Sequence, residues 1–225
     1  MSETKAVRSW IESHNRDYGA ARERLELCRN TILNGRISDA SDMLKASYIN
    51  AVMSIQTAKD RHESAFVAYH SGNKELKQAC LDTVYGGQKH GWLSDTFGRV
   101  NFDNVVIAVR HHVRNNTFGE LLDVLTDKIK GVSYRKCSFM LSMVGIYEYM
   151  CIDSNVGRFA DIGDRNNFSN GSDYLDTCYE IYHSIIEKSP FGRLFPPFLV
   201  QWAIYDYERG EHARHMVFYN EVLNE

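Results

Sequence analysis

Proline is scarce in this chain: three occur among 225 residues, and two of them are the adjacent pair Pro196 and Pro197. Proline interrupts helices because its ring fixes φ and removes a backbone donor, so this scarcity permits many long helices. No stretch sustains the alternation of polar and apolar residues that marks strands, and neither a repeat nor a low-complexity tract occurs. These absences predict an all-α fold.

Cysteine is sparse and irregularly placed, with five residues and no CxxC pair. An odd number without such pairs argues against a disulfide framework, so we expect reduced thiols. The C-terminal region has no cysteine cluster, which argues against an iron–sulfur cluster. His212 and His215 lack the pattern of a zinc site. The sequence therefore predicts neither a metal nor another cofactor.

Long apolar runs and excess positive charge are also missing. No apolar run approaches the roughly 20 residues that span a bilayer, so no membrane association is expected. The first ten residues are polar and charged, so no signal peptide is expected. The net charge is −3, whereas proteins that coat nucleic acid are usually basic. Indiscriminate DNA binding is therefore disfavoured, while a local basic face stays open.

Helical periodicity covers most of the chain. Apolar residues recur at helical spacing in segments separated by glycine, asparagine and proline. Helices are predicted at residues 5–15, 20–33, 60–69, 74–85, 102–115, 118–129, 134–145 and 174–188. A further helix is predicted to start at the Ser38-Asp39 cap and to end near residues 56–57. A last helical region is predicted to begin with residues 198–207. A polar, Gly- and Asn-rich surface loop is expected at 162–172.

A tight turn is predicted at residues 129–136, between two amphipathic helices. Gly131 can adopt the left-handed conformation that a short helix–helix turn requires. Such a turn leaves amides unpaired at the start of the next helix, where the helix dipole also favours an anion. Lys130 and Lys136 could add positive charge beside one phosphate. An ordinary turn between two helices has the same features, so both interpretations stay open.

Asp153 follows four residues of mainly apolar character, Tyr149 to Ile152. A carboxylate that emerges from an apolar segment is costly to bury unless something uses it. The alternative is that Asp153 or Ser154 caps a short helix that continues to Phe159. The two roles are compatible, because a capping carboxylate can also lie at the mouth of a cleft.

The turn and the acid together resemble the helix-hairpin-helix DNA glycosylase superfamily of endonuclease III-like enzymes. The family pattern is L-P-G-V-G-x-K-x-A, an apolar helix and V-D-x-x-x-x-R. Here it is matched by I-K-G-V-S-Y-R-K-C at 129–137, then Ile152-Asp153 and Arg158, with Asp153 18 residues after Arg135. Upstream, M-S-I-Q-T-A-K-D at 53–60 is similar to the family's L-S-x-Q-T-x-D and places Gln56 in the glutamine position.

Several positions depart from the family pattern. Lys130 replaces proline, and Ser133 replaces the second glycine, which requires a turn that tolerates a side chain there. Arg135 stands where the family's catalytic lysine lies, with Lys136 next to it. The iron–sulfur cysteines of part of the family are missing.

The resemblance implies one unit over residues 1–225, with two helical lobes and an active-site cleft between them. A six-helix lobe would cover about 37–150 and carry the hairpin, and a second lobe would combine 1–36 with 151–225. Residues 198–210 resemble the last helix of that fold. The protein is expected to be a monomer that binds double-stranded DNA with an altered base. The expected location is cytoplasmic: at the nucleoid in a prokaryote or virus, and nuclear in a eukaryote.

The activity implied by the resemblance is removal of a damaged or modified base. The enzyme would flip the nucleotide out, and Gln56 would fill the gap. The hairpin would grip the DNA backbone, and Asp153 would stabilise the cationic sugar and activate water. The residues expected to contact DNA are Lys130, Gly131, Val132, Ser133, Tyr134, Arg135, Gln56 and Arg158. Further candidate phosphate contacts, with a plain surface charge as the alternative, are Lys59, Arg61 and Lys89.

A strand-cleaving enzyme would instead use a lysine amine to form a Schiff base with the sugar. Arg135 stays protonated and cannot do this readily, which leaves Lys136 as the catalytic candidate. One residue turns a helical side chain by about 100°, so Lys136 is expected to face away from the Arg135 position. Base removal without strand cleavage is therefore favoured.

Two alternatives remain. A relative of the same fold could modify a base without excising it, as in phage-type thymine-hypermodifying proteins that the resemblance includes. A non-catalytic DNA-binding module could have kept only the hairpin. Candidates to stack on an extruded base, with core packing as the alternative, are Tyr147, Tyr149, Trp202, Tyr205 and Tyr207.

Overall fold

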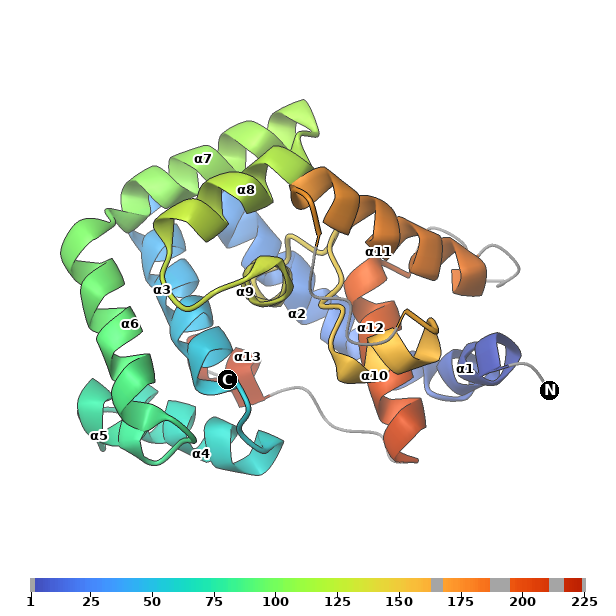
Figure 1. Ribbon diagram of the computed structural model, residues 1–225, viewed down its shortest axis with the longest axis horizontal. Coiled ribbons are helices and arrows are strands. Elements are labelled where there is room, and N and C mark those ends of the chain that lie inside the picture. Colours follow the sequence, from blue (N-terminus) through green and yellow to red (C-terminus); the bar gives the residue numbers. More distant parts are fainter. Residues whose placement is uncertain (1–2, 163–167, 187–194, 211–216, 224–225) are drawn as a thin grey trace.

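The computed structural model describes residues 3–162, 168–186, 195–210 and 217–223. In these ranges the chain forms thirteen helices and no strand (Figure 1), so the all-α prediction is confirmed. None of the described helices is both long enough and apolar enough to cross a membrane. The helices are α1 (Glu3–Ser13), α2 (Asn15–Asn34), α3 (Ile37–Met53), α4 (Lys59–His70), α5 (Leu76–Leu81), α6 (Gly86–Arg99), α7 (Phe102–Asn115), α8 (Phe118–Lys128), α9 (Tyr134–Met143), α10 (Ser154–Phe159), α11 (Gly171–Ile186), α12 (Pro197–Arg209) and α13 (Val217–Val222).

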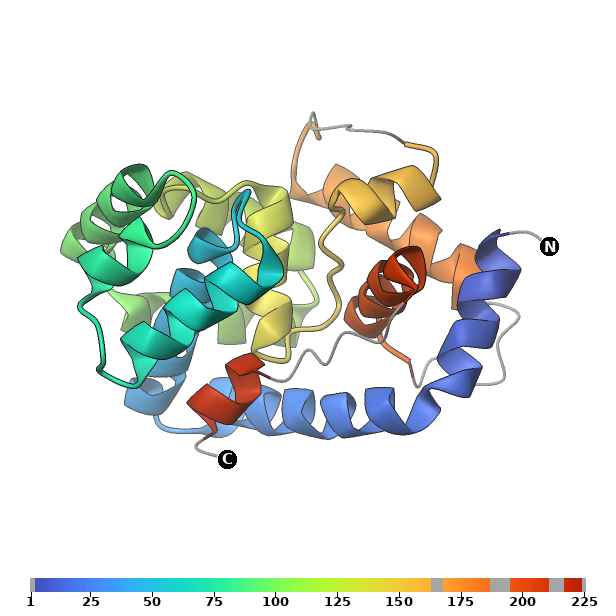
Figure 2. The ribbon, with the colours of Figure 1, turned by 90° about the horizontal axis from the view of Figure 1, so that it is seen from below.

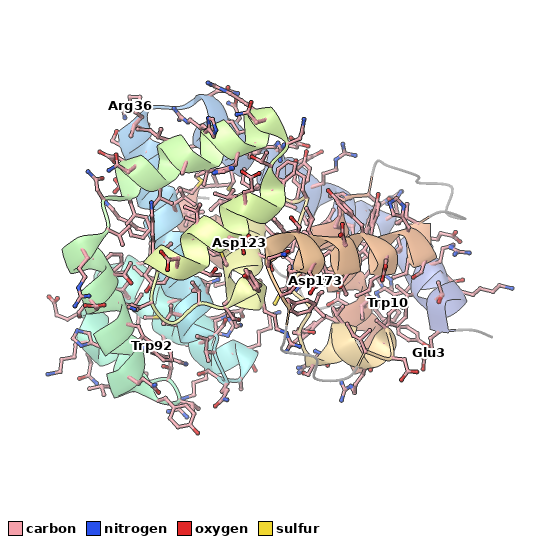
Figure 3. The ribbon with its side chains drawn as sticks, turned by 45° about the horizontal axis from the view of Figure 1, so that its top comes forward. Glu3, Trp10, Arg36, Trp92, Asp123 and Asp173 are labelled. Atoms are coloured by element: carbon pink, nitrogen blue, oxygen red, sulfur yellow. The ribbon has the colours of Figure 1, made fainter. Side chains whose placement is uncertain are left out.

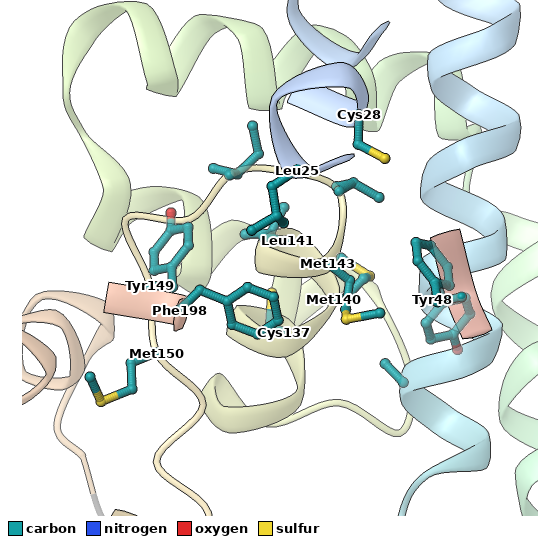
Figure 4. Packing of buried hydrophobic residues seen from close by; sticks show 14 of the residues in the cluster. Leu25, Cys28, Tyr48, Cys137, Met140, Leu141, Met143, Tyr149, Met150 and Phe198 are labelled. Atoms are coloured by element: carbon teal, nitrogen blue, oxygen red, sulfur yellow. The ribbon is translucent and has the colours of Figure 1, made fainter. Parts of the chain in front are cut away.

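Helix α9 lies at the centre of the molecule and is seen nearly end-on in Figure 1. It packs against α3 and α8. Its side chains Cys137, Met140 and Leu141 are fully buried, among residues from α2, α3 and α12 (Figure 4). A helix that is apolar on nearly every side needs partners on every side, which accounts for its central position.

Helix α2 extends along one side of the molecule, beneath the helices that surround α3 and beneath those that adjoin α12 (Figure 2). Its Arg29 guanidinium forms an ion pair with Glu148 at 2.6 Å, in the segment after α9. Nearer its start, the Tyr18 hydroxyl donates to Asp206 of α12 at 2.8 Å. The helix is thus attached at both ends. The division into two lobes near residue 150 stays a prediction.

The segment 149–152 is buried although it has no helical structure. Buried amides and carbonyls need partners, and here side chains supply them. The Tyr174 hydroxyl donates to the Met150 carbonyl at 2.7 Å and accepts the Ile152 amide at 3.0 Å. These bonds hold the backbone that leads to Asp153.

Asp123 of α8 joins three elements at one point. Its Oδ1 accepts the Tyr134 hydroxyl at the start of α9 at 2.7 Å and the Gly171 amide at the start of α11 at 2.8 Å. Figure 3 labels Asp123 on α8 and Asp173, which lies in the first turn of α11. The pKa of Tyr134 is raised to about 12, mainly because its hydroxyl donates a hydrogen bond to the Asp123 carboxylate.

Two helices differ from the sequence-based predictions. Residues 74–85 were expected to be helical and to stop at Gly86-Gly87, but α5 ends at Leu81 and Gly86 begins α6. Glycine has a low helix propensity and normally favours the end of a helix. Helix α6 forms nevertheless, because Leu93 and Thr96 bury one of its faces against the core. Seven helices therefore lie between residues 37 and 150, where six were expected. The helix at 198–207 is followed by α13, and the expected loop at 162–172 lies partly outside the described residues.

The hairpin between α8 and α9 has the predicted left-handed glycine. Gly131 has φ +75°, and a Cβ added there would lie 2.5 Å from the indole of Trp92. Ser133 has φ −98° and ψ 178°, an extended conformation that any residue adopts. A serine therefore fits where the glycosylase pattern has its second glycine.

We predict that Gly131→Ala lowers the free energy of unfolding by about 2–4 kcal/mol, because the left-handed backbone and the contact with Trp92 both oppose a side chain. Urea unfolding monitored by circular dichroism measures the change. The matched control is Gly91→Ala in α6, where the added methyl meets nothing within 4 Å. That change should raise stability by about 0.5–1 kcal/mol. Equal behaviour of the two variants would contradict the assignment of strain to Gly131.

Candidate functional site

A cavity of about 590 Å³ opens where the start of α9, the turn after α3 and the buried segment before α10 come together. Side chains from the start of α4, from α12 and from α13 complete its wall. The wall is mixed in character. Aromatic and aliphatic groups alternate with charged and amide groups, as in many sites for small organic ligands.

Four of the site residues predicted from the sequence line this cavity: Gln56, Arg135, Lys136 and Asp153. They come from three segments that lie far apart in the chain. Of the predicted stacking residues, Trp202 and Tyr205 line the cavity, and the other three predicted tyrosines do not. The structure thus collects the catalytic candidates around one space.

Arg158 and the hairpin residues 130–134 do not line the cavity. Arg158 is exposed, and its guanidinium donates to the Asn155 carboxamide at 2.7 Å and lies 3.8 Å from the carboxylate of Glu208. The Lys130 amide donates to Thr96 at 3.1 Å. Any contacts of the hairpin with DNA would therefore lie beside the cavity, on the segment that leads into α9.

The four amides from Gly131 to Tyr134 donate to no acceptor within the described part of the chain. They precede the positive end of the α9 dipole, so they can bind an anion. The fifth amide of the hairpin, that of Lys130, is not available because Thr96 accepts it. The amides that we expect to bind a phosphate are therefore those of residues 131–134.

Asp153 is the N-cap of α10, as the sequence indicated. Its Oδ1 accepts the amides of Asn155 at 2.9 Å and Val156 at 3.0 Å. Within the described ranges its Oδ2 receives no hydrogen bond, and the residue lines the cavity. Capping and exposure to the cavity therefore coexist in one carboxylate, with one oxygen assigned to each.

Lys136 and Arg135 both line the cavity, although neighbouring helical residues were expected to diverge. Their long side chains reach the same space from different directions around α9. The Lys136 ammonium donates to the Ser54 hydroxyl at 2.8 Å and lies 5.3 Å from the centre of the Phe139 ring. The amine is thus held at the cavity wall by a hydrogen bond and a cation–π contact.

Lys89 is not a surface charge, so that expectation and the phosphate-contact role are both wrong. Its side chain has no exposed area, and burial lowers its pKa to about 8. The ammonium donates to the carbonyls of Met53 and Ile55 at 2.8 and 2.6 Å and to the Thr57 hydroxyl at 2.8 Å. These three bonds hold the turn after α3 in which Gln56 has φ +51°.

We predict that Lys89→Met lowers the free energy of unfolding by about 2–4 kcal/mol, because the variant leaves buried acceptors without a donor. The measurement is urea unfolding at pH 7. Lys77→Met, at an exposed position of α5, is the control and should change stability by less than about 0.5 kcal/mol. A Lys89→Met protein as stable as the control would show that the three bonds do not stabilise the turn.

His62 and Glu63 line the cavity from the first turns of α4. Burial, together with the smaller effect of the Lys136 charge, lowers the pKa of His62 to about 4. Burial raises the pKa of Glu63, and the nearby ammonium of Lys59, 3.9 Å away, partly offsets this. His62 is therefore neutral at neutral pH and adds no positive charge to the cavity.

We predict that the free energy of unfolding falls as the pH decreases from 6.5 to 4, in part because of His62. The pKa of this imidazole is near 6.5 when the chain is unfolded and about 4 when it is folded. Between these values the unfolded state binds more protons, so acid favours unfolding, by about 2 kcal/mol from this one group. His62→Gln should reduce the decline measured by urea unfolding at several pH values. The exposed His111→Gln should leave it unchanged, and an equal decline in all three proteins would contradict the prediction.

Two buried carboxamides line the cavity and were not recognised as site residues: Asn50 of α3, 3% exposed, and Gln201 of α12, 5% exposed. Each is a single amide in an otherwise apolar stretch, S-Y-I-N-A-V-M and F-L-V-Q-W-A-I. That placement was the available signal, because a polar group inside an apolar helix face needs a partner.

Thiol and metal chemistry receive no support in this cavity. All five cysteines are buried and free, and burial raises the pKa of Cys151, which lines the cavity, to about 12. A thiol with that pKa is a poor nucleophile. Within the described residues no three His, Cys, Asp or Glu side chains are grouped to hold a metal ion. His212 and His215 lie outside the described residues.

The chain matches no protein-family model, no curated protein and no solved structure.

Proposed function

We propose that this protein is a helix-hairpin-helix DNA glycosylase that hydrolyses the bond between an altered base and its sugar in duplex DNA. In this proposal the two-lobed fold of that superfamily places the cavity in its cleft. The observation that carries it is the convergence of Gln56, Lys136 and Asp153 on one cavity. All three residues hold positions at or beside those of the glycosylase pattern, and they come from separate segments of the chain.

Asp153 has the geometry of a group that stabilises positive charge and activates water. Two amides fix the carboxylate through Oδ1, so Oδ2 keeps a defined direction. As the base departs, the sugar becomes cationic, and a nearby carboxylate lowers the energy of that state. The same oxygen can accept a proton from the water that attacks the anomeric carbon.

DNA would be gripped beside the cavity rather than inside it. The open amides of residues 131–134 suit one phosphate, and a bond to backbone amides requires no particular base. Gln56 is exposed on the turn that Lys89 holds, so its side chain can enter the gap left by an extruded base. A rigid turn favours this because less ordering is needed on binding.

Strand cleavage would require a neutral lysine amine at the sugar. Lys136 lines the cavity, but its ammonium donates to Ser54 and lies over Phe139. Arg135 keeps its proton and cannot replace it. Hydrolysis by Asp153 is therefore the proposed reaction, and a Schiff base on Lys136 is the alternative that the experiment separates.

We expect Asp153→Asn to lower the rate of base excision at least about 100-fold, because asparagine cannot accept the proton or stabilise the cation. Asparagine is an equally good N-cap, so α10 and the melting temperature should be kept. Duplexes that carry a panel of altered bases are incubated with the enzyme, then treated with alkali to cleave abasic sites. The control, Asp103→Asn at an exposed position of α7, should cleave like the unaltered protein.

The other outcomes decide against parts of the proposal. Excision by Asp153→Asn at the unaltered rate would remove Asp153 from the chemistry. A complex trapped by borohydride, and lost in Lys136→Gln, would establish the lysine mechanism. A mass change on the base without alkali-dependent cleavage would favour base modification. Binding without any chemistry would leave only a DNA-binding module.

A further inference from the structure

We infer that the cavity selects an oxo-substituted nucleobase, with the Gln201 carboxamide as the donor to its carbonyl oxygen. The inference rests on the proposed function and names the class of base that the cavity takes. Two buried carboxamides, the aromatic wall and the donors and acceptors around them support it.

Gln201 presents a donor of fixed orientation. Its Oε1 accepts the Cys151 amide at 2.7 Å. Because the other partner is an N–H group, the oxygen must face Cys151, and Nε2 is the end left over. Among the described residues the bond to Cys151 is the only hydrogen bond of this side chain, so Nε2 has no acceptor there, and Gln201 lines the cavity. A nearly buried amide nitrogen without an acceptor is the feature expected where a ligand supplies one.

Asn50 adds a second, adaptable carboxamide. It is 3% exposed, lines the cavity, and its side chain makes no hydrogen bond within the described residues. Without a protein partner to fix it, this amide can offer either its N–H or its oxygen. A ligand with a complementary edge would supply the partner that the described residues do not.

The apolar part of the wall suits a flat ring. Phe139, Trp202 and Phe218 line the cavity, and Phe139 and Trp202 each contact Phe198 in the core. Aromatic faces stack on any nucleobase irrespective of its substituents. Selection among bases must then come from the polar groups at the ring edge.

Those polar groups are mainly donors. The ammonium groups of Lys59 and Lys136 and the Nε2 of Gln201 can only donate. Of the two carboxylates, Glu63 lies beside Lys59, and Asp153 has Oδ1 in the cap of α10 while Oδ2 is assigned to the sugar in the proposed reaction. A carbonyl oxygen finds a donor in this setting. An exocyclic amino group placed at the Gln201 Nε2 would face another donor, leaving both groups unpaired there, and such mismatches reject a ligand strongly.

The first test uses the unaltered full-length protein and pairs of bases that differ by oxo against amino. Duplexes with uracil and hypoxanthine should be excised at least about tenfold faster than those with cytosine and adenine. Free uracil and free cytosine are titrated in parallel by calorimetry, and uracil should bind more tightly. A preference for the amino member, equal binding of the two, or binding of neither would overturn the inference. The absence of any excision would defeat the glycosylase proposal alone, because the titration does not depend on chemistry.

The second test replaces the donor while keeping its partner. Gln201→Glu retains an oxygen for the Cys151 amide but presents an acceptor to the base. Excision of the oxo base should fall at least about tenfold. Affinity for a duplex with a tetrahydrofuran abasic site should stay unchanged, because that site has no base. As the pH is lowered, protonation returns a donor, so the rate relative to the unaltered protein should rise.

The matched control is Gln78→Glu, the same substitution at an exposed position of α5. It should leave both rate and selectivity unchanged. Melting temperatures identify a Gln201→Glu protein that fails to fold, and in that case the titration of free bases decides. A folded Gln201→Glu protein that keeps the selectivity of the unaltered chain would remove Gln201 from base recognition.

Discussion

The hydrogen bonds that side chains make to the buried backbone at 149–152 are the constraint on which the site depends. This segment is enclosed without helical structure, so its polar backbone must find partners on neighbouring helices. Tyr174 of α11 and Gln201 of α12 provide them. In doing so they connect the central helix α9 to α11 and α12. They also determine where Asp153 leaves the core. The hydrogen bond from the Cys151 amide also orients the Gln201 carboxamide. One set of hydrogen bonds therefore fixes both the position of Asp153 and the direction of the Gln201 Nε2.

Two lysines near the cavity show how burial separates a lysine that supports the fold from one that borders open space. Lys89 is enclosed by acceptors of the protein itself, and its ammonium has no direction left for a ligand. Lys136 is only partly buried, with one hydroxyl partner and an aromatic neighbour, and it borders open space. As residue types, the two lysines are equally polar. Their different roles follow from how many acceptors the fold places around each one.

Features set by local chain chemistry could be predicted from the sequence. Gly131 in a left-handed turn and Asp153 as a helix cap depend on a few neighbouring residues, and both occur as expected. Helix α6 was missed because its glycines disfavour a helix locally while tertiary burial of Leu93 stabilises it. The roles of Lys89 and Gln201 were missed for a related reason: each depends on partners far away in the chain. The meeting of Gln56, Lys136 and Asp153 at one cavity was implied only through a family pattern, which carries three-dimensional information that periodicity lacks.

The attachment of α2 at both ends has a mechanical consequence. Its twenty residues form a rod of about 30 Å, bonded to Glu148 near one end and to Asp206 near the other. A hinge movement that changed the separation of Glu148 and Asp206 would have to bend this rod or break one of those attachments. The two attachments therefore oppose a change in the relative position of Glu148 and Asp206 when the protein meets a ligand. If duplex DNA is that ligand, the distortion needed to extrude a nucleotide falls on the DNA. Sequences that kink easily would then be engaged first, before any base is recognised.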